Sequence, residues 1–130
     1  MKTRPTFDES LRSGIELFNR REFYEAHEAW EAGWIDEPSD DRLLLQGLIQ
    51  VAAGFYKLQC AAPSGTVKLL DAGLAKLRPY VGNSRGVDLQ PLLLEVERWR
   101  ARAEELVAQK RADFDPSRLP KIRYAGPTGI

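Results

Sequence analysis

The segment that most limits the possible folds is LLLQGLIQVAAGFY, residues 43–56, which contains no charged residue. A membrane-spanning helix needs about 20 predominantly apolar residues, so this run of 14 residues is too short to cross a bilayer. Over residues 40–59, large apolar side chains recur at helical spacing on two neighbouring faces, and one polar stripe contains Gln46, Gln50 and Lys57. A helix that is apolar around so much of its circumference lies in the middle of a bundle. We therefore expect a buried central helix over residues 40–59.

Apolar periodicity predicts four further helices and no strand, so the expected fold class is all-α, a single five-helix bundle. The first helix follows a capping box, in which Thr6 is the N-cap and Glu9 lies three residues later. Asn19 and Glu22 repeat this signal before the second helix, and Ser39 precedes the central helix as its cap. The last two helices are expected over residues 64–79 and 89–111.

The first two helices are expected to form an antiparallel hairpin that resembles a tetratricopeptide unit. Small and aromatic residues fall at spacings close to those of that repeat: Gly14, Leu17, Ala26, Trp30, Gly33 and Pro38. The alternative interpretation is that any tight helical hairpin needs small residues where its helices cross.

The length of 130 residues predicts one domain with a sizeable core. We expect the helical bundle to occupy residues 1–112 and a C-terminal tail to occupy residues 113–130. The end of this tail, LPKIRYAGPTGI, is rich in Pro and Gly. We therefore expect it to be extended, either docked on the bundle or frayed.

Charge and composition limit the function classes. The chain has 19 basic and 19 acidic residues, and residues 1–38 hold nine acids against five bases, a balance of −4. This is not the clustered basic surface that is typical of a nucleic-acid-binding protein. The N-terminal sequence MKTRPTFDES lacks the apolar core of a signal peptide. We expect a cytoplasmic protein that binds neither nucleic acid nor a membrane.

The second helix carries the most distinctive polar residues, in the segment EFYEAHEAWEAGW, residues 22–34. At about 100° per residue, Phe23, Trp30 and Trp34 share one apolar stripe. His27 lies inside this stripe and Glu31 lies at its edge, one turn further along the helix. We predict that His27 and Glu31 lie within hydrogen-bonding reach of each other and are mostly buried.

The segment HEAWE begins like the zinc-protease motif His-Glu-x-x-His, but Glu31 stands where the second histidine would be. The chain has one histidine and one cysteine, so it lacks the ligands of a catalytic zinc site or a Cys/His cluster. Glu28, the base in such a protease, points away from the apolar stripe. We therefore reject the metalloprotease interpretation and name no catalytic residue.

Two interpretations of the His27–Glu31 pair stay open. In the structural one, Glu31 accepts a hydrogen bond from His27, and glutamine amides of the central helix satisfy the remaining groups. In the other, the pair holds a metal or small ligand with oxygen donors or a second subunit, which would suit Mg²⁺, Mn²⁺ or Fe²⁺ better than Zn²⁺. The sequence requires no cofactor and identifies no metal. The candidate polar cluster consists of His27, Glu31, Trp34, Tyr24, Gln46 and Gln50.

The segment HEAWEAGW also contains the pattern His-x-x-x-Glu-x-x-Trp, formed by His27, Glu31 and Trp34. This pattern, followed by LLQGLIQVAAGFYKL and LLDAGLAKLRPY, resembles the signature and later helices of domain of unknown function 309, a family of small bacterial and archaeal proteins. The resemblance covers roughly residues 7–80. It implies the all-helical fold of that family and implies no activity.

The function that the sequence favours is a non-catalytic binding or interaction module. Its expected partner is another protein or a second copy of the chain, and no Ser-His-Asp arrangement can be proposed around His27. The alternative is a metal-binding or small-ligand-binding protein, or an enzyme, that uses His27 and Glu31. Polar groups that enter an apolar face often mark functional sites, which keeps this alternative open.

Overall fold

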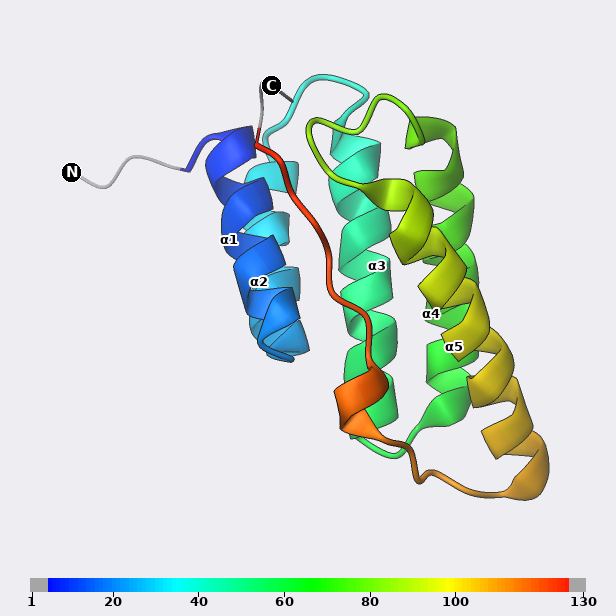
Figure 1. Cartoon of the computed structure of the whole chain (residues 1–130). Helices are drawn as coiled ribbons and strands as arrows, with labels where there is room; N and C mark the ends of the chain where they lie inside the picture. Colours follow the sequence, from blue (N-terminus) through cyan, green and yellow to red (C-terminus); the bar gives the residue numbers. More distant parts are fainter. Residues whose placement is uncertain (1–4, 127–130) are drawn as a thin grey trace.

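The computed structural model describes residues 5–126 and contains five α-helices. Figure 1 shows them as a bundle in which consecutive helices run side by side. Over the described part of the chain there is no strand, and the expected all-α five-helix bundle is confirmed. The α-helices are α1 (Phe7–Asn19), α2 (Phe23–Trp34), α3 (Arg42–Gln59), α4 (Pro63–Leu77) and α5 (Leu89–Gln109), and the short 3-10 helices are η1 (Arg78–Tyr80) and η2 (Pro116–Arg118).

The central helix is α3, as its uncharged sequence predicts. It packs against α2 on one side and α4 on the other. Gly73 lets α4 approach closely, because a Cβ at this position would lie 2.8 Å from Cγ2 of Val51. Among helices formed by residues 5–126, none combines the length and hydropathy that a membrane crossing requires. The apolar side chains on the main face of α3 are all buried: Leu44, Leu48, Val51, Phe55 and Leu58.

The helices α1 and α2 form the predicted hairpin, and a glycine lets them touch. Gly14 lies directly against the indole of Trp30, so a Cβ at this position would overlap the ring. The indole Nε1 donates a hydrogen bond of 3.1 Å to the backbone carbonyl of Leu11. Because Trp30 is fully buried, packing and this hydrogen bond together fix how the two helices cross.

The capping box of α1 forms, whereas the predicted cap of α2 is wrong. The hydroxyl of Thr6 accepts a hydrogen bond from the backbone of Glu9, and the Glu9 carboxylate accepts one from the backbone of Thr6. Helix α2 follows Glu22 with no side-chain cap. Asn19 cannot cap it, because this residue ends α1 and its amide binds the C-terminal tail.

The predicted cap of the central helix is also wrong. Helix α3 begins at Arg42, and its N-cap is Asp41 without a side-chain hydrogen bond to the helix. The hydroxyl of Ser39 instead donates to the carboxylate of Glu37 at 2.6 Å. The acidic connection between α2 and α3 is therefore a turn closed by its own side chains.

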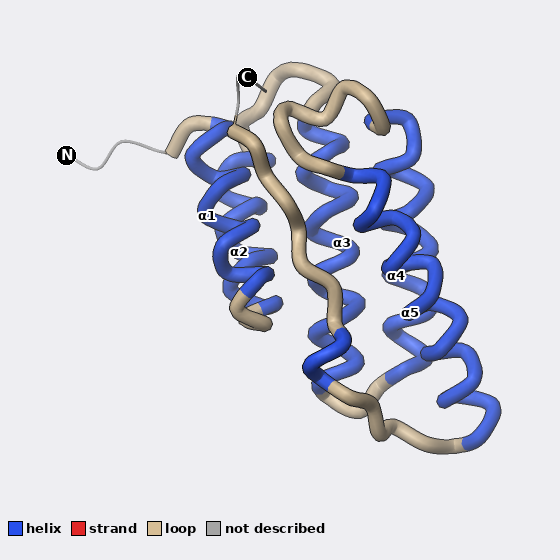
Figure 2. The backbone as a smooth tube through the Cα atoms, viewed as in Figure 1, coloured by secondary structure: helices blue, strands red, loops and turns tan. Residues whose placement is uncertain are grey.

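The C-terminal tail is docked along the bundle. Figure 2 shows residues after α5 returning past η2 as an extended loop between α1 and α5. Leu119 and Ile122 are buried and belong to the same hydrophobic core as the helices. Tyr124 forms an isolated antiparallel bridge with Val87. The boundary that we placed after residue 112 stays a prediction, and residues 127–130 lie outside the described residues.

Candidate functional site

The His27–Glu31 pair forms, but it lies at the surface. Nε2 of His27 lies 2.9 Å from Oε2 of Glu31, within the expected reach, while the two side chains keep 29% and 45% of their exposure. Both side chains are therefore partly buried, and His27 is more buried than Glu31. Phe23, Ala26 and Trp30 fill the buried side of α2. His27 lies about 40° round the helix from Phe23, which places it at the rim of the packed surface.

Gln46 and Gln50 do not complete a buried cluster with this pair. Both are half-buried, and neither amide is hydrogen-bonded to His27 or Glu31. Oε1 of Gln50 is buried without a hydrogen-bond partner. The two glutamines lie about 80° and 120° round α3 from Tyr56, the side chain that contacts α2. The predicted cluster is therefore reduced to a partly exposed His–Glu pair.

Trp34 ends α2 as a half-buried side chain beside the start of α3. The guanidinium of Arg42 lies over its ring, 5.3 Å from the centroid, which is a cation–π arrangement. Nε1 of Trp34 is buried without a hydrogen-bond partner. Trp34 therefore contributes packing between α2 and α3, and its one polar atom is unsatisfied.

Two exposed tyrosines lie beside the pair. The ring centroid of Tyr24 lies 5.9 Å from that of His27 and 5.4 Å from that of Tyr56. Tyr24 is 47% exposed and Tyr56 is 37% exposed. Sequence reasoning placed Tyr56 on an apolar face of the central helix and missed its role here, because its partner depends on how α2 crosses α3.

A cavity of ≈ 300 Å³ opens where the two tyrosines meet. Nε2 of Gln59 closes one end by donating a 3.1 Å hydrogen bond to the backbone carbonyl of Arg21. The guanidinium of Arg21 is bonded to the tail, so the charges at the cavity mouth are carboxylates. The lining residues are Arg21, Glu22, Phe23, Tyr24, Glu25, Tyr56 and Gln59.

The exposed side of α2 is acidic. Glu22, Glu25 and Glu28 are exposed and form no ion pair with a Lys or Arg of residues 5–126. The sequence has no Lys or Arg between Arg21 and Arg42. We use the term aromatic–acidic face for Tyr24, His27 and Tyr56 together with Glu22 and Glu25. Its uncompensated carboxylates give this face a negative potential.

The hydroxyl of Tyr56 is held in its neutral form. A side-chain hydrogen bond with Cys60, one turn further along α3, raises the pKa of Tyr56 above its ordinary value, and the nearby Tyr24 and Glu25 add to this effect. Cys60 is a free, exposed thiol. The phenol of Tyr56 therefore remains uncharged well above neutral pH, so that its ring can attract a cation and its hydroxyl can still donate.

Metal-ligating side chains are sparse around His27 and Glu31. Within residues 5–126, no group of three or more His, Cys, Asp and Glu side chains lies close enough together to hold a metal ion. The histidine and glutamate supply two donors, and Tyr24 lies beside them as a ring contact.

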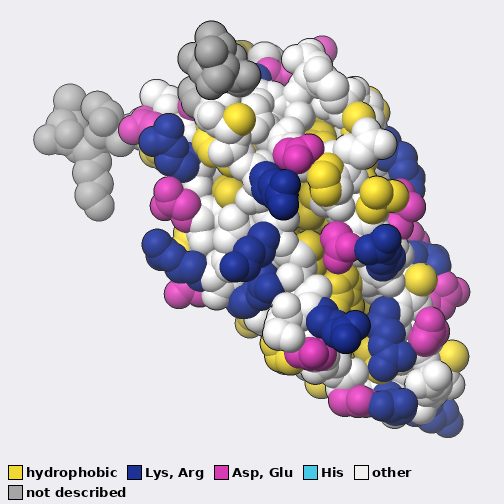
Figure 3. All heavy atoms as spheres, viewed as in Figure 1, with side chains coloured by type: hydrophobic (Ala, Val, Ile, Leu, Met, Phe, Trp, Pro, Cys, Tyr) yellow, Lys and Arg dark blue, Asp and Glu magenta, His cyan; other side chains and the backbone are white. Residues whose placement is uncertain are grey.

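A larger cavity of ≈ 770 Å³ lies where the tail passes α5, and sequence reasoning did not predict it. The rings of Trp99 and Phe114 meet edge to face with centroids 6.0 Å apart. Figure 3 shows this side of the molecule, with hydrophobic side chains between charged ones beside the tail and α5. The lining arginines all have acidic partners, so no unpaired positive charge faces the cavity: Arg98 with Glu95, Arg102 with Glu105 and Arg118 with Asp115.

The fold and these surfaces define a small all-α protein with a docked tail and an exposed aromatic–acidic face. The model of the family described as Domain of unknown function (DUF309) matches residues 11–69, and this finding supports the resemblance to that family. The matched region runs from α1 into α4 and includes all six residues of the predicted cluster. No curated protein matches the chain.

Proposed function

We propose that this protein is a non-catalytic binding module whose aromatic–acidic face binds a basic segment of a partner protein. The observation that carries the proposal is the pair of exposed rings, Tyr24 and Tyr56, at the mouth of an acidic cavity. In this proposal a Lys or Arg side chain of the partner enters between the two tyrosines. The expected cytoplasmic location and the absence of nucleic acid among its partners are part of the proposal and rest on the sequence.

The size of the cavity supports a single side chain as its occupant. Ligand pockets for small molecules span roughly 300–1,000 Å³, and this one, at ≈ 300 Å³, is at the lower limit. A cation over an exposed aromatic ring gains about 0.5–1 kcal/mol. Glu22 and Glu25 add attraction that salt screens over about 8 Å at physiological ionic strength. We therefore expect binding that weakens as the salt concentration rises.

The surroundings of His27 support binding over catalysis. Nucleophilic catalysis requires a hydroxyl or thiol within hydrogen-bonding reach of its base. The contacts of His27 within the described residues are the carboxylate of Glu31 and the ring of Tyr24. Glu28, which would be the base of a protease helix, is exposed on α2.

The proposal is tested with ¹⁵N-labelled full-length protein and three short peptides that differ only in a central Lys, Arg or Glu. The Lys and Arg peptides are expected to shift the amide resonances of α2 and the second half of α3 saturably, and the Glu peptide is expected not to. Tyr24→Ala should weaken binding roughly three- to fivefold, the equivalent of one exposed cation–π contact. Leu94→Ala is the matched control, because Leu94 is an exposed apolar residue on α5.

Divalent metals added to the same samples distinguish the alternative function. Saturable effects of Mn²⁺ or Mg²⁺ centred on His27 and lost in His27→Ala would support a metal site. Shifts that follow the basic peptides and persist in His27→Ala would support the binding module. No saturable shift on α2 or α3 with any peptide would refute the proposed function.

A further inference from the structure

The C-terminal tail is held through its main chain, in the way that a binding groove holds a peptide. Nδ2 of Asn19 donates to the carbonyl of Ile122 at 2.9 Å, and the amide of Ile122 donates back to Oδ1 of Asn19 at 2.7 Å. One side chain thus satisfies both backbone groups of one tail residue. This contact depends on the extended backbone and not on the side chain that the tail carries.

A second side chain, from Arg21 just after the end of α1, extends this recognition. Nη2 of Arg21 donates to the carbonyl of Leu119 at 2.7 Å, and Nη1 donates to the carbonyl of Pro120 at 3.0 Å. Arg21 has φ 68°, the left-handed region that Gly normally occupies after a helix. An arginine in this conformation places its guanidinium beside the tail, and Gln59 holds its carbonyl from the other side.

The opposite wall of the groove also forms hydrogen bonds with backbone atoms of the tail. Nε1 of Trp99 donates to the carbonyl of Arg118 at 3.3 Å. The loop before α5 adds two bonds, from the amide of Asp88 to the carbonyl of Arg123 at 2.9 Å and from the amide of Ala125 to the carbonyl of Gly86 at 2.8 Å. The carbonyls of residues 118–120, 122 and 123 are thus hydrogen-bonded.

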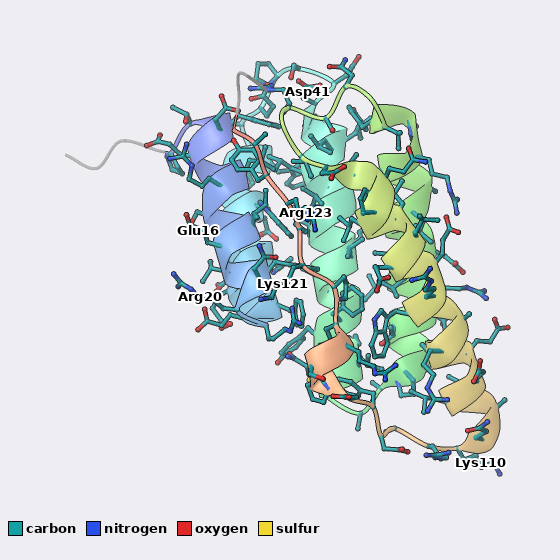
Figure 4. All side chains as sticks on the ribbon, in the orientation of Figure 1. Glu16, Arg20, Asp41, Lys110, Lys121 and Arg123 are labelled. Carbon is teal, nitrogen blue, oxygen red and sulfur yellow. The ribbon has the colours of Figure 1, made fainter. Side chains whose placement is uncertain are left out.

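Apolar side chains anchor the tail between these hydrogen bonds. Leu119 and Ile122 are 4% and 3% exposed. Pro120, which lies between them in the sequence, is also buried. Lys121 and Arg123, both labelled in Figure 4, lie on the exposed side of the tail. The groove therefore recognises a Leu-Pro-x-Ile pattern and leaves the basic side chains in solvent.

The segment that connects the tail to the bundle is irregular, and Phe114 packs it against Trp99. Helix α5 ends at Gln109, and residues 110–115 precede η2. The hydrogen-bonded ion pair in this connection, between Arg111 and Asp113, is exposed. Six residues can span about 20 Å when extended. The tail can therefore leave its groove without unwinding α5.

We propose that this groove is a peptide-binding site for an extended Leu-Pro-x-Ile segment, and that a second copy of this chain supplies the competing ligand. The groove consists of Asn19, Arg21, Trp99 and the loop of residues 86–88. The second copy fits because its tail carries the identical sequence, so every contact made within one chain can be made between two. A tail from a second copy must compete with the chain's own tethered tail. A short flexible linker gives the tethered tail an effective concentration on the order of millimolar at the groove.

Two full-length variants test the exchange when they are mixed. Asn19→Ala damages the groove and keeps a native tail, and Ile122→Ala damages the tail and keeps a native groove. Their mixture offers one undamaged groove and one undamaged tail, which can meet only between chains. Each substitution should weaken its own internal contact about tenfold or more. Analytical ultracentrifugation should then show a 1:1 complex in the mixture at about 100 µM and little of it in either variant alone.

The matched controls are Asn83→Ala and Lys121→Ala, because these exposed residues lie outside the groove contacts. Replacing either partner of the mixture by its control should abolish the complex. Monomers throughout the mixture, with both variants folded by circular dichroism, would overturn the proposal.

If either variant fails to fold, wild-type protein labelled at the exposed Cys60 is sedimented at rising total concentration. A dimer that excess free peptide of residues 113–126 dissociates would support the proposal. The absence of a dimer, or a dimer that the peptide leaves intact, would overturn it.

Discussion

The two sides of the α1–α2 hairpin differ in how completely their polar groups are satisfied. On the side of the tail, the side chains of Asn19 and Arg21 make four hydrogen bonds to backbone atoms of the tail. On the side of α3, Nε1 of Trp34 and Oε1 of Gln50 are buried without partners. The hairpin is thus completed by its own chain on one side and left incomplete on the other.

This difference separates structure from binding. Buried polar groups are normally paired, so an unsatisfied one needs a specific explanation. Two further buried hydroxyls lack a partner: that of Tyr124 in the tail, and that of Ser10 inside the hairpin, where it lies against Gly33. Exposed aromatic rings and unpaired carboxylates lie together on the side of α2. We therefore assign the binding of a different partner protein to the aromatic–acidic face, whereas the tail side stabilises the fold by binding a Leu-Pro-x-Ile segment of this chain or of a second copy.

The largest expected effect compares one isoleucine from each region. Ile122→Ala should lower the free energy of unfolding by about 2–5 kcal/mol, because the side chain is 3% exposed in the shared core. Ile35→Ala, at the end of α2 and 58% exposed, should change it by about 0.5 kcal/mol or less. Urea denaturation of both variants measures the difference. Equal midpoints would mean that the tail does not fold with the bundle.

The second comparison concerns polar side chains. Asn19→Ala leaves the amide and carbonyl of Ile122 without their partner and should cost about 1–3 kcal/mol. Gln46→Ala, which removes a half-buried amide with no hydrogen bond to the His–Glu pair, should cost about 0.5 kcal/mol. Thermal denaturation ranks the two variants. A larger loss of stability for Gln46→Ala than for Asn19→Ala would mean that the more important polar contacts are those of α3.

The third prediction is a substitution that stabilises the protein. Gln50→Leu removes a buried carbonyl oxygen that has no partner, so it should raise the free energy of unfolding by about 1 kcal/mol. Gln59→Leu is the matched control, because the amide of Gln59 is bonded to the carbonyl of Arg21 and its loss should destabilise. If Gln50→Leu also destabilises, the amide of Gln50 has a partner in solution.

Local patterns predicted the fold well because they depend on neighbours in the sequence. The uncharged run of α3 predicted a central helix, and the Thr6–Glu9 capping box formed as expected. Asn19 shows the limit of this reasoning. Its cap signal was reasonable, but a tail residue 103 positions later uses its amide instead. No local pattern can reveal such a partner.

The candidate site was less predictable for the same physical reason. Helical periodicity in α2 correctly predicted the contact between His27 and Glu31, because an i, i+4 contact depends on one helix alone. Whether that contact is buried depends on the angle at which α2 meets α3. The same angle pairs Tyr24 with Tyr56 and leaves the glutamines to one side. Periodicity within single helices contains no information on that angle.

The smallest expected effect separates the surface pair from the buried cluster that the sequence suggested. A buried Glu31 would leave His27 unpaired on substitution and cost about 1–3 kcal/mol. Because Glu31 keeps 45% of its exposure, water replaces the lost partner, and exposed ion pairs contribute about 1 kcal/mol or less. Glu31→Ala and exposed Glu28→Ala should therefore differ by about 0.5 kcal/mol or less in their free energies of unfolding. Urea denaturation of the two variants at the same pH measures this difference. A loss specific to Glu31→Ala of more than about 1 kcal/mol would restore the structural cluster, and α2 would then be satisfied on both of its sides.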